Sequence, residues 1–351
     1  MTSESTQTSR AHEPRIVIID AGHAGYDIER AVVENAGGRL DVFEGDRLDR
    51  QGRIAFAQGA AAIIVRGSII DGAFMDALPG LRGIVRCGVG CENIDIAAAT
   101  ARGIRVANVQ GYGNHSVSDH ALMLILACMR DLPTGIREFQ KTFGRPPRPD
   151  MIELREAVLG IIGLGRIGGA LAEKAGGLFR RVIACDPYVP DDRFRALRTH
   201  RVDLAGLLAE SDVISVNCTL TPETAGMLGR DAFGKMRRRP VLVNTARGAI
   251  IDDAALLDAL DRGVIHSAGL DVFSEEPPLP TLEALVAHPR VVATGHYGFY
   301  SMAAMAELQR RAAENALALV RGDAIPDCLN PEVPVPSEGH RVGSSGAKLS
   351  E

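Results

Sequence analysis

The segment from Val158 to Asp186 restricts the possible folds of this chain more than any other part of the sequence. It starts with an apolar run, residues 158–162, which is typical of a buried parallel strand. Three glycines in G-x-G-x-x-G spacing come next, and the residues after them favour a helix. A second apolar run, residues 182–185, ends in the acidic Asp186. Strand, glycine turn, helix and strand in this order predict one βαβ unit of a doubly wound parallel sheet.

Each glycine of this motif has its own physical role. Gly163 permits a tight turn, Gly165 lets the backbone approach a pyrophosphate, and Gly168 lets the helix pack closely on the strand. The helix N-terminus offers free N–H groups and the positive end of its dipole to phosphates. Asp186 can accept hydrogen bonds from both ribose hydroxyls and would repel a 2′-phosphate. The segment therefore predicts a dinucleotide site that prefers NAD to NADP, and an ordinary glycine-rich turn is the alternative.

Composition narrows the classes of function. A chain of 351 residues suits two domains, and its net charge of -5 argues against a general nucleic-acid binder. The sequence contains no apolar run long enough for a membrane span, and residues 1–13 lack the apolar core of a signal peptide. The 6 cysteines form no C-x-x-C pair, which predicts reduced, buried thiols in a cytoplasmic protein. No metal site is expected, although Cys87 and Cys91 leave a metal or redox role open.

Short apolar runs alternate with helical patterns along the chain, and this alternation indicates a parallel α/β architecture. The predicted strands are residues 15–20, 61–65, 83–86 and 105–108, and then 158–162, 182–185, 213–217, 240–244, 266–271 and 291–294. One set precedes the glycine motif and the other starts with it, which indicates two sheets and two domains. Residues 120–130 are apolar almost all round and predict a buried helix. Either this is a simple core helix, or it links the domains and is also covered by a second subunit.

Three segments that end or follow predicted strands carry the side chains best suited to catalysis. Arg247 can hold a carboxylate through two parallel hydrogen bonds, and His296 can give or take a proton near neutral pH. Glu276 could accept a hydrogen bond from the other ring nitrogen of His296 and so favour the protonated ring. Ligands bind beyond the carboxyl ends of strands in such sheets, so we expect these side chains to meet there. Taken singly, Arg247 could also be a solvated charge, Glu276 could cap a turn, and His296 could be an ordinary loop histidine.

With these motifs combined, the chain resembles the D-isomer-specific 2-hydroxyacid dehydrogenases along nearly all of its length. The motifs that carry the resemblance are V-R-C-G-V-G-C-E-N-I-D at 85–95, G-L-G-R-I-G at 163–168, N-T-A-R-G-A-I-I-D at 244–252, G-L-D-V-F-S-E-E-P-P at 269–278 and G-H-Y-G-F-Y-S at 295–301. The run S-D-H-A-L-M-L-I-L-A and the ending Phe299-Tyr300-Ser301 are most similar to the branch with glycerate, phosphoglycerate and C-terminal-binding-protein-like members.

The resemblance implies an α/β fold with two doubly wound parallel-sheet domains, a flavodoxin-like substrate domain and an inserted Rossmann NAD-binding domain. The expected substrate domain is residues 12–114 plus 300–330, and the expected NAD-binding domain is residues 115–299. Residues 1–11 and 331–351 are expected to be disordered tails. The resemblance also implies a homodimer through the apolar helix near His120, and neither a nucleic acid nor a membrane is expected as a partner.

The resemblance further implies roles for individual residues. The implied catalytic residues are Arg247, Glu276 and His296. The residues implied to bind NAD are Gly163, Gly165, Arg166, Ile167, Gly168, Asp186, Thr245, Ala246, Arg247, Asp271 and His296. The residues implied to bind the substrate carboxylate are Arg66, Gly67, Ser68, Val89, Gly90 and Arg247.

The expected activity is a reversible hydride transfer between NAD(H) and a D-2-hydroxy acid / 2-keto acid pair, with His296 protonating the ketone oxygen. Two alternatives stay open: a non-catalytic, NAD-sensing protein similar to a corepressor, and a phosphite-type dehydrogenase on the same scaffold. The sequence specifies neither the side chain of the substrate nor the preferred direction of reaction.

A few positions depart from the pattern of the family. Asn217 lies in a loop that lacks the usual His and Pro, which leaves the cofactor contacts of that loop open. Gly295 stands where a proline usually precedes the catalytic histidine, so the loop that carries His296 has more conformational freedom. Tyr297 and Phe299 place large rings beside His296, where they are expected to narrow or line the substrate pocket.

Overall fold

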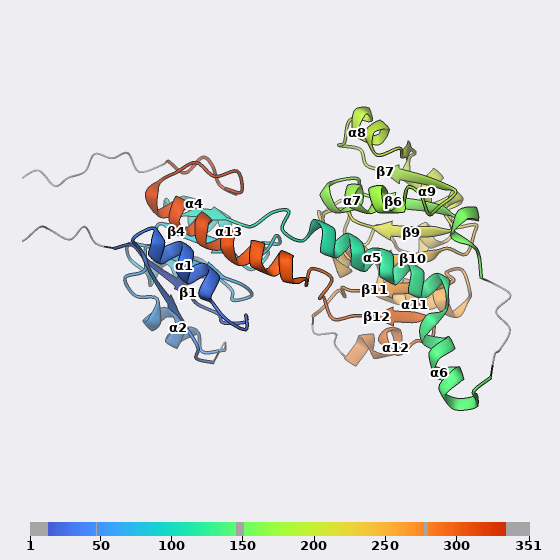
Figure 1. The fold of residues 1–351 in the computed structure, drawn as a ribbon, viewed down its shortest axis with the longest axis horizontal. Helices are drawn as coiled ribbons and strands as arrows, with labels where there is room; N and C mark the ends of the chain where they lie inside the picture. The colour runs from blue at the N-terminus through green and yellow to red at the C-terminus, as the bar shows by residue number, and fades with distance from the viewer. Residues whose placement is uncertain (1–12, 47, 145–150, 277–279, 335–351) are drawn as a thin grey trace, which may run out of the picture. The chain divides into compact units, whose positions relative to one another are not determined.

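The computed structural model describes residues 13–46, 48–144, 151–276 and 280–334, which form two compact units (Figure 1). The first unit contains the chain up to Tyr112 together with the chain from Met302 onward. The second unit is Gly113–Ser301, so it is inserted into the first. The tails expected to be disordered lie mostly outside the described residues.

The first unit is built on a five-stranded parallel sheet. Its strands are β1 (Arg15–Ile18), β2 (Arg39–Val42), β3 (Ala62–Val65), β4 (Gly83–Arg86) and β5 (Arg105–Ala107). Its helices are α1 (Asp27–Asn35), α2 (Arg50–Phe56), α3 (Gly72–Asp76), α4 (Ile96–Ala101) and α13 (Met302–Arg321). The strand order β2-β1-β3-β4-β5, with all neighbours parallel, is the predicted flavodoxin-like order.

Apolar layers cover both faces of this sheet, as a doubly wound fold requires. Alternate residues of a strand point to opposite faces, so Ile16 and Ile18 pack with α13 whereas Val17 packs with Phe74 of α3. Helix α13 lies beside α1 and over β3 and β4 (Figure 1). The last described helix of the chain is therefore part of the core of the first unit.

The second unit contains a seven-stranded parallel sheet. Its strands are β6 (Val158–Ile162), β7 (Arg181–Cys185), β8 (His200–Arg201), β9 (Val213–Val216), β10 (Val241–Asn244), β11 (Ser267–Leu270) and β12 (Val291–Ala293). The order is β12-β11-β10-β9-β6-β7-β8, with all neighbours parallel. Numbered from β6, this is the Rossmann order with one more strand, and its direction reverses between β6 and β9. The predicted fold class is confirmed.

Helices surround this second sheet. They are α5 (Asn114–Met129), α6 (Leu132–Thr142), α7 (Arg166–Ala175), α8 (Asp191–Ala196), α9 (Leu204–Glu210), α10 (Arg230–Phe233), α11 (Asp253–Asp261) and α12 (Glu283–Val286). Short 3-10 turns occur at Leu154–Glu156, Gly248–Ile250 and Pro280–Leu282. No helix of the described ranges combines the length and the apolar character that a membrane span requires.

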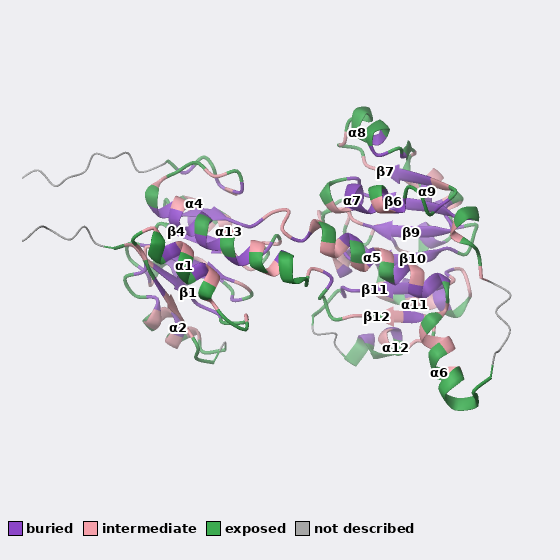
Figure 2. Ribbon diagram, in the orientation of Figure 1, coloured by how far each residue is buried: buried purple, intermediate pink, exposed green. Residues whose placement is uncertain are grey.

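Helix α5 covers the sheet of its own unit. Its residues Leu124, Ile125 and Cys128 are buried, and the helix packs on β10, β11 and α7. A Cβ atom at Gly269 of β11 would lie 2.9 Å from the Cβ of Leu124, so glycine there lets the helix approach the strand. These contacts favour the core-helix interpretation of residues 120–130. Helix α6 differs, because none of its residues, all of them described, is buried (Figure 2).

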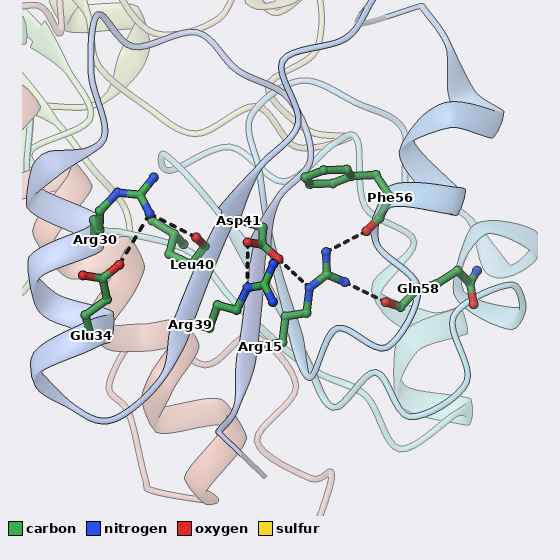
Figure 3. A network of polar contacts seen from close by, with 8 residues as sticks. All are labelled: Arg15, Arg30, Glu34, Arg39, Leu40, Asp41, Phe56 and Gln58. Carbon is green, nitrogen blue, oxygen red and sulfur yellow. Dashed lines mark hydrogen bonds and ion pairs between the residues drawn. The ribbon is translucent and has the colours of Figure 1, made fainter.

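The sequence did not predict β2 and β8, and both are edge strands. Edge strand β2 pairs with β1 through its backbone, and ion pairs between charged side chains add to this pairing. Arg15 of β1 pairs with Asp41 of β2 at 2.6 Å, and its other nitrogens donate to the carbonyl oxygens of Phe56 and Gln58 (Figure 3). Arg39 donates to the second carboxylate oxygen of Asp41 at 3.0 Å (Figure 3). Charged side chains on an edge strand also discourage pairing with another sheet.

Candidate active site

The glycine motif occupies the turn between β6 and α7. Gly163 has a φ of +88°, and a Cβ atom there would lie 2.7 Å from the Cα of Cys218, so only glycine suits this turn. A Cβ atom at Gly168 would lie 2.0 Å from the carbonyl oxygen of Gly163. At Gly165, by contrast, a Cβ atom would have no neighbour within 4 Å. This face of the loop is open to a ligand, and Arg166 begins the first turn of α7 behind it.

Asp186 connects the end of β7 to the glycine loop. One carboxylate oxygen accepts a hydrogen bond from the N–H of Leu164 at 2.8 Å, and the other accepts one from the N–H of Tyr188 at 3.0 Å. A carboxylate oxygen can accept more than one hydrogen bond, so Asp186 can hold the loop and still accept from ribose hydroxyls. Its position fits the predicted role.

Two buried polar atoms lie beyond the neighbouring strands β9 and β10. They are Oδ1 of Asn217 and Oγ1 of Thr245, and neither has a hydrogen-bond partner within the part of the chain that the structure describes. The amide nitrogen of Asn217 donates to the carbonyl oxygen of Ser215 at 3.1 Å, which fixes the direction of the amide. An unsatisfied buried group costs about 1–3 kcal/mol, so a ligand that supplies donors here gains affinity. Together with the open glycine loop, these atoms fit a bound dinucleotide.

Arg247 lies in a loop that buried Asn244 shapes. The side chain of Asn244 donates to the carbonyl oxygen of Arg247 at 2.9 Å and accepts from the N–H of Ala246 at 3.0 Å. The guanidinium of Arg247 donates to the carbonyl oxygen of Ala246 at 2.8 Å. A Cβ atom at Gly248 would lie 1.8 Å from the carbonyl carbon of Phe273. Glycine at 248 therefore lets the arginine loop lie directly against the segment that carries Glu276.

Glu276 and His296 form a direct contact. The Nδ1 atom of His296 lies 2.5 Å from Oε2 of Glu276, and Oε1 of Glu276 accepts from the N–H of Phe273 at 3.2 Å. The ring of Phe299 meets the His296 ring edge to face at 6.2 Å. The structure thus brings together the predicted histidine and glutamate, and it leaves Nε2 of His296 facing away from this pair.

Asp271 is buried and surrounded by hydrogen-bond donors. Its carboxylate accepts from Thr294 Oγ1 at 2.6 Å, from the N–H of Tyr297 at 3.1 Å and from the N–H of Gly298 at 2.9 Å. Burial alone would raise the pKa of Asp271, but hydrogen bonds from His120, Thr294 and Gly298 outweigh it and lower that pKa. The carboxylate shapes the loop around His296, and its predicted contact with NAD stays a prediction.

In the first unit, Asp20 organises the loop at Arg66, Gly67 and Ser68. The carboxylate of Asp20 accepts from the backbone N–H groups of these three residues at 2.7, 2.9 and 2.8 Å. The loop and Asp20 follow β3 and β1, between which this sheet changes direction. The hydroxyl of Ser68 accepts a hydrogen bond from Arg53. Asp20 is not among the predicted site residues, although it has the same signal as Asp186, an acidic residue that ends an apolar strand.

Val89 and Gly90, the other predicted carboxylate contacts, follow β4. The carbonyl oxygen of Val89 accepts from the side-chain amide of Asn108 at 2.7 Å, and Val89 is 48% exposed. Nearby, His23 Nε2 lies 3.7 Å from Cys87 Sγ. Burial, followed by the charge of Arg66, lowers the pKa of His23 to about 4.

The cysteines include two that are buried, Cys87 and Cys128. All six are free thiols. Burial raises the pKa of Cys87 to about 12, so this thiol stays protonated at neutral pH. Over the described ranges, no three side chains of His, Cys, Asp or Glu come together in a way that could hold a metal ion.

Comparisons of sequence match the second unit to a known family. A family model described as "D-isomer specific 2-hydroxyacid dehydrogenase, NAD binding domain" matches residues 122–298. The D-3-phosphoglycerate dehydrogenase of Mycobacterium tuberculosis is 36% identical over 305 residues, which are 86% of this chain and 57% of that protein. The glyoxylate/hydroxypyruvate reductase B of Serratia proteamaculans is 34% identical over 301 residues, 84% of this chain and 92% of that protein. This chain thus spans little more than half the length of the mycobacterial relative.

Comparisons of structure extend the similarity to both units. A crystal structure of a Thermus thermophilus protein covers 90% of this chain and 99% of its own, with a TM-score of 0.80 and 32% sequence identity. A D-lactate dehydrogenase of Treponema pallidum covers 90% of this chain and 99% of its own, with a TM-score of 0.77 and 27% identity.

Proposed function

Because this chain belongs to the D-isomer specific 2-hydroxyacid dehydrogenase family, we propose that it is an NAD-dependent oxidoreductase acting on a D-2-hydroxy acid / 2-keto acid pair. One observation carries the proposal: Nδ1 of His296 lies 2.5 Å from the carboxylate of Glu276. The segment that carries Glu276 packs in turn against the Arg247 loop, at Gly248. An imidazole held by a carboxylate can protonate a ketone. A guanidinium in the same site can bind the carboxylate of the substrate.

The second unit is the NAD-binding domain of this family, and its residues suit the cofactor. The open face at Gly165 and the unpartnered atoms of Asn217 and Thr245 support this fit. The proposed cofactor-binding residues are Gly163, Gly165, Arg166, Ile167, Gly168, Asp186, Thr245, Ala246, Arg247, Asp271 and His296. When bound, NAD(H) supplies the hydride acceptor or donor.

The proposed catalytic residues divide the remaining chemistry. Arg247 would orient the carboxylate of the substrate through parallel, charge-assisted hydrogen bonds. His296 would donate the proton on Nε2 to the ketone oxygen and would take it back from the hydroxyl in the reverse direction. Glu276 would accept the hydrogen bond of Nδ1 and offset the positive charge of the protonated ring.

The proposed carboxylate-binding residues of the first unit are Arg66, Gly67, Ser68, Val89 and Gly90. Asp20 already accepts from the backbone N–H groups of the first three, and Arg53 donates to the Ser68 hydroxyl. Because these N–H groups and this hydroxyl are already engaged, the guanidinium of Arg66 would be the group of this loop that contacts the carboxylate.

A panel of 2-keto acids tests the activity. The purified chain is mixed with NADH and glyoxylate, hydroxypyruvate, pyruvate or 3-phosphohydroxypyruvate, and the loss of NADH absorbance is followed. We expect turnover with at least one acid, and a D-configured product from any acid other than glyoxylate, whose product is achiral. The rate with NADPH should be much lower because Asp186 would face its 2′-phosphate. Binding of NADH without turnover would support the NAD-sensing alternative, and NAD reduction by phosphite alone would support the phosphite-type alternative.

The same proposal includes a homodimer, for which α6 offers a surface. Leu132, Ile136, Phe139 and Phe143 recur at helical spacing, share one side of the segment and are all about half or more exposed. A second copy of the chain is the proposed occupant, because the apolar residues of α5 are used inside the unit. The cytoplasmic location expected from the reduced cysteines stays a prediction.

A further inference from the structure

The loop of residues 294–298 holds His296 in an unfavourable backbone conformation. His296 has a φ of +53°, in the left-handed region that favours glycine. Gly295 precedes it, and a glycine restricts the backbone less than any other residue. The conformation of His296 therefore depends on contacts that the loop makes with the rest of the unit.

The main contacts come from Asp271, at the end of β11. Its carbonyl oxygen accepts from the N–H of His296 at 2.7 Å. Its carboxylate accepts from Thr294, Tyr297 and Gly298. Asp271 thus contacts the loop on both sides of the histidine.

A second residue, His120 of α5, completes this arrangement. Its Nε2 lies 2.9 Å from Thr294 Oγ1 and 3.3 Å from Asp271 Oδ1. Because Thr294 donates its only hydroxyl proton to Asp271, its oxygen must accept from His120, and Nε2 of His120 must carry a proton. The ring of His120 also packs edge to face on the ring of Tyr297 at 5.1 Å. One side chain thus connects a core helix to both ends of the loop.

The loop approaches His120 closely at Gly298. A Cβ atom there would lie 2.9 Å from Asp271 Oδ2 and 3.0 Å from Cδ2 of His120. A side chain at position 298 would push Asp271 and His120 away from the loop. Glycine at 298 therefore permits the close contact between the loop and these two residues.

We propose that His120 is a positioning residue, which holds the 294–298 loop so that His296 keeps the geometry that proton transfer needs. The inference rests on the proposed function of His296. Gly295 does little to restrict the backbone of the loop, and the contacts of His120 from α5 provide that restriction instead. A donor at the Nε2 position of His120 is needed, and a positive charge is not.

Three variants separate positioning from a general effect on stability. His120→Ala removes the donor, and His120→Gln keeps an amide donor near the former Nε2. Gly295→Pro, introduced into His120→Ala, restrains the loop from within. Position 295 can accept proline, because a Cβ atom there meets no atom within 4 Å and, in the described chain, its N–H donates no backbone hydrogen bond. His288→Ala is the matched control, because His288 is equally buried and pairs with Asp261 instead.

For His120→Ala we expect kcat to fall by about 10- to 100-fold, since small misplacements of a reacting group have effects of this size. The Kd for NADH should stay within about twofold and KM should change little, because the glycine loop at 163–168 and Asp186, which would hold the pyrophosphate and the ribose, make no contact with His120 among the described residues. His120→Gln and the His120→Ala/Gly295→Pro double variant should recover most of the lost kcat. The His288→Ala control should leave kcat unchanged.

Hydrogen exchange of the peptide that contains residues 294–298 gives a readout that needs no substrate. His120→Ala should speed exchange there and leave the 158–175 segment unchanged, and the proline should slow it again. The proposal is overturned if exchange in the loop is unaffected, if kcat is unchanged, or if NADH binding weakens as much as kcat. A wild-type chain that reduces no 2-keto acid would refute the proposed function, while the exchange measurement would still decide whether His120 holds the loop.

Discussion

At the residue scale, the same device recurs at three strand ends: an acidic side chain collects the backbone N–H groups of a neighbouring loop. Asp20 holds the loop after β3, Asp186 holds the glycine loop, and Asp271 holds the loop of His296. For Asp186 and Asp271, the sequence predicts ligand binding alone. Their hydrogen bonds indicate that they also shape the loops that would contact the ligand, so substitutions there change geometry as well as affinity.

Asp271→Asn tests this structural role through the pH dependence of the free energy of unfolding. Hydrogen bonds lower the pKa of Asp271 in the folded chain below the ordinary value of 3.8. The stabilisation is therefore fully present above that value and is lost as the pH falls through the lower, folded pKa. Urea unfolding should show a clear loss of stability in Asp271→Asn at pH 7 and a smaller one below the ordinary value. An equal loss at every pH would mean that the charge of Asp271 is not involved.

His296→Ala and Glu276→Gln should have different kinetic effects. The alanine variant loses proton transfer, which typically contributes about 10²–10⁴-fold to the rate. It should keep most of its affinity for NADH, because the proposed phosphate and ribose contacts at the glycine loop and Asp186 are unchanged. The glutamine variant keeps the shape but replaces the carboxylate beside Nδ1 of His296 with a neutral amide, which holds the ring less firmly. Its kcat for ketone reduction should therefore fall, by less than in His296→Ala, while NADH binding is kept. If kcat of Glu276→Gln equals that of the wild-type chain while His296→Ala is inactive, Glu276 is not the partner, and Glu275 or Asp271 is tested next.

At the element scale, the buried strands are the ones that the sequence predicts. Strand β6 is buried along its whole length, so its apolar run was readily identified, whereas both residues of β8 are exposed and give no such signal. The contact between Glu276 and His296 could be predicted because both follow strands whose carboxyl ends lie at one edge of the sheet. The contacts of Asp20 and His120 could not, because they depend on which distant loop or helix packs beside them. The apolar side of α6 was missed, although its helical spacing is visible in the sequence.

Gly248→Ala tests whether the Arg247 loop and the Glu276 segment must lie in direct contact. The added Cβ atom would meet the backbone of Phe273 at 1.8 Å, and backbone atoms cannot rotate away as a flexible side chain could. We expect the Arg247 loop and the Glu276 segment to separate, with kcat/KM for the keto acid reduced by about 10²-fold or more. Gly234→Ala, where a Cβ atom meets only ordinary contacts at 3.5 Å, is the matched control. Equal kinetics of the two variants would show that this close approach is not needed.

At the scale of the whole molecule, the exposed apolar side of α6 is the proposed interface of a homodimer. Phe139→Glu would place a charge in a dimer interface, at a cost of several kcal/mol, and should yield a monomer in light scattering. Lys141→Gln changes the net charge by the same amount on the opposite side of the helix and should leave the dimer intact. A wild-type chain that is monomeric at micromolar concentration would contradict the proposed dimer, and a dimer that survives Phe139→Glu would exclude α6 as its interface.

The insertion of one unit into the other has a consequence for biosynthesis. The first unit needs α13 to cover one face of its sheet, yet the ribosome makes α13 only after all of Gly113–Ser301. During that interval the apolar residues that α13 will cover, such as Ile64 and Val85, remain without their helix. The inserted unit is continuous and can fold as it emerges. The chain is therefore most prone to aggregation, and most dependent on chaperones, while its N-terminal sheet waits for α13.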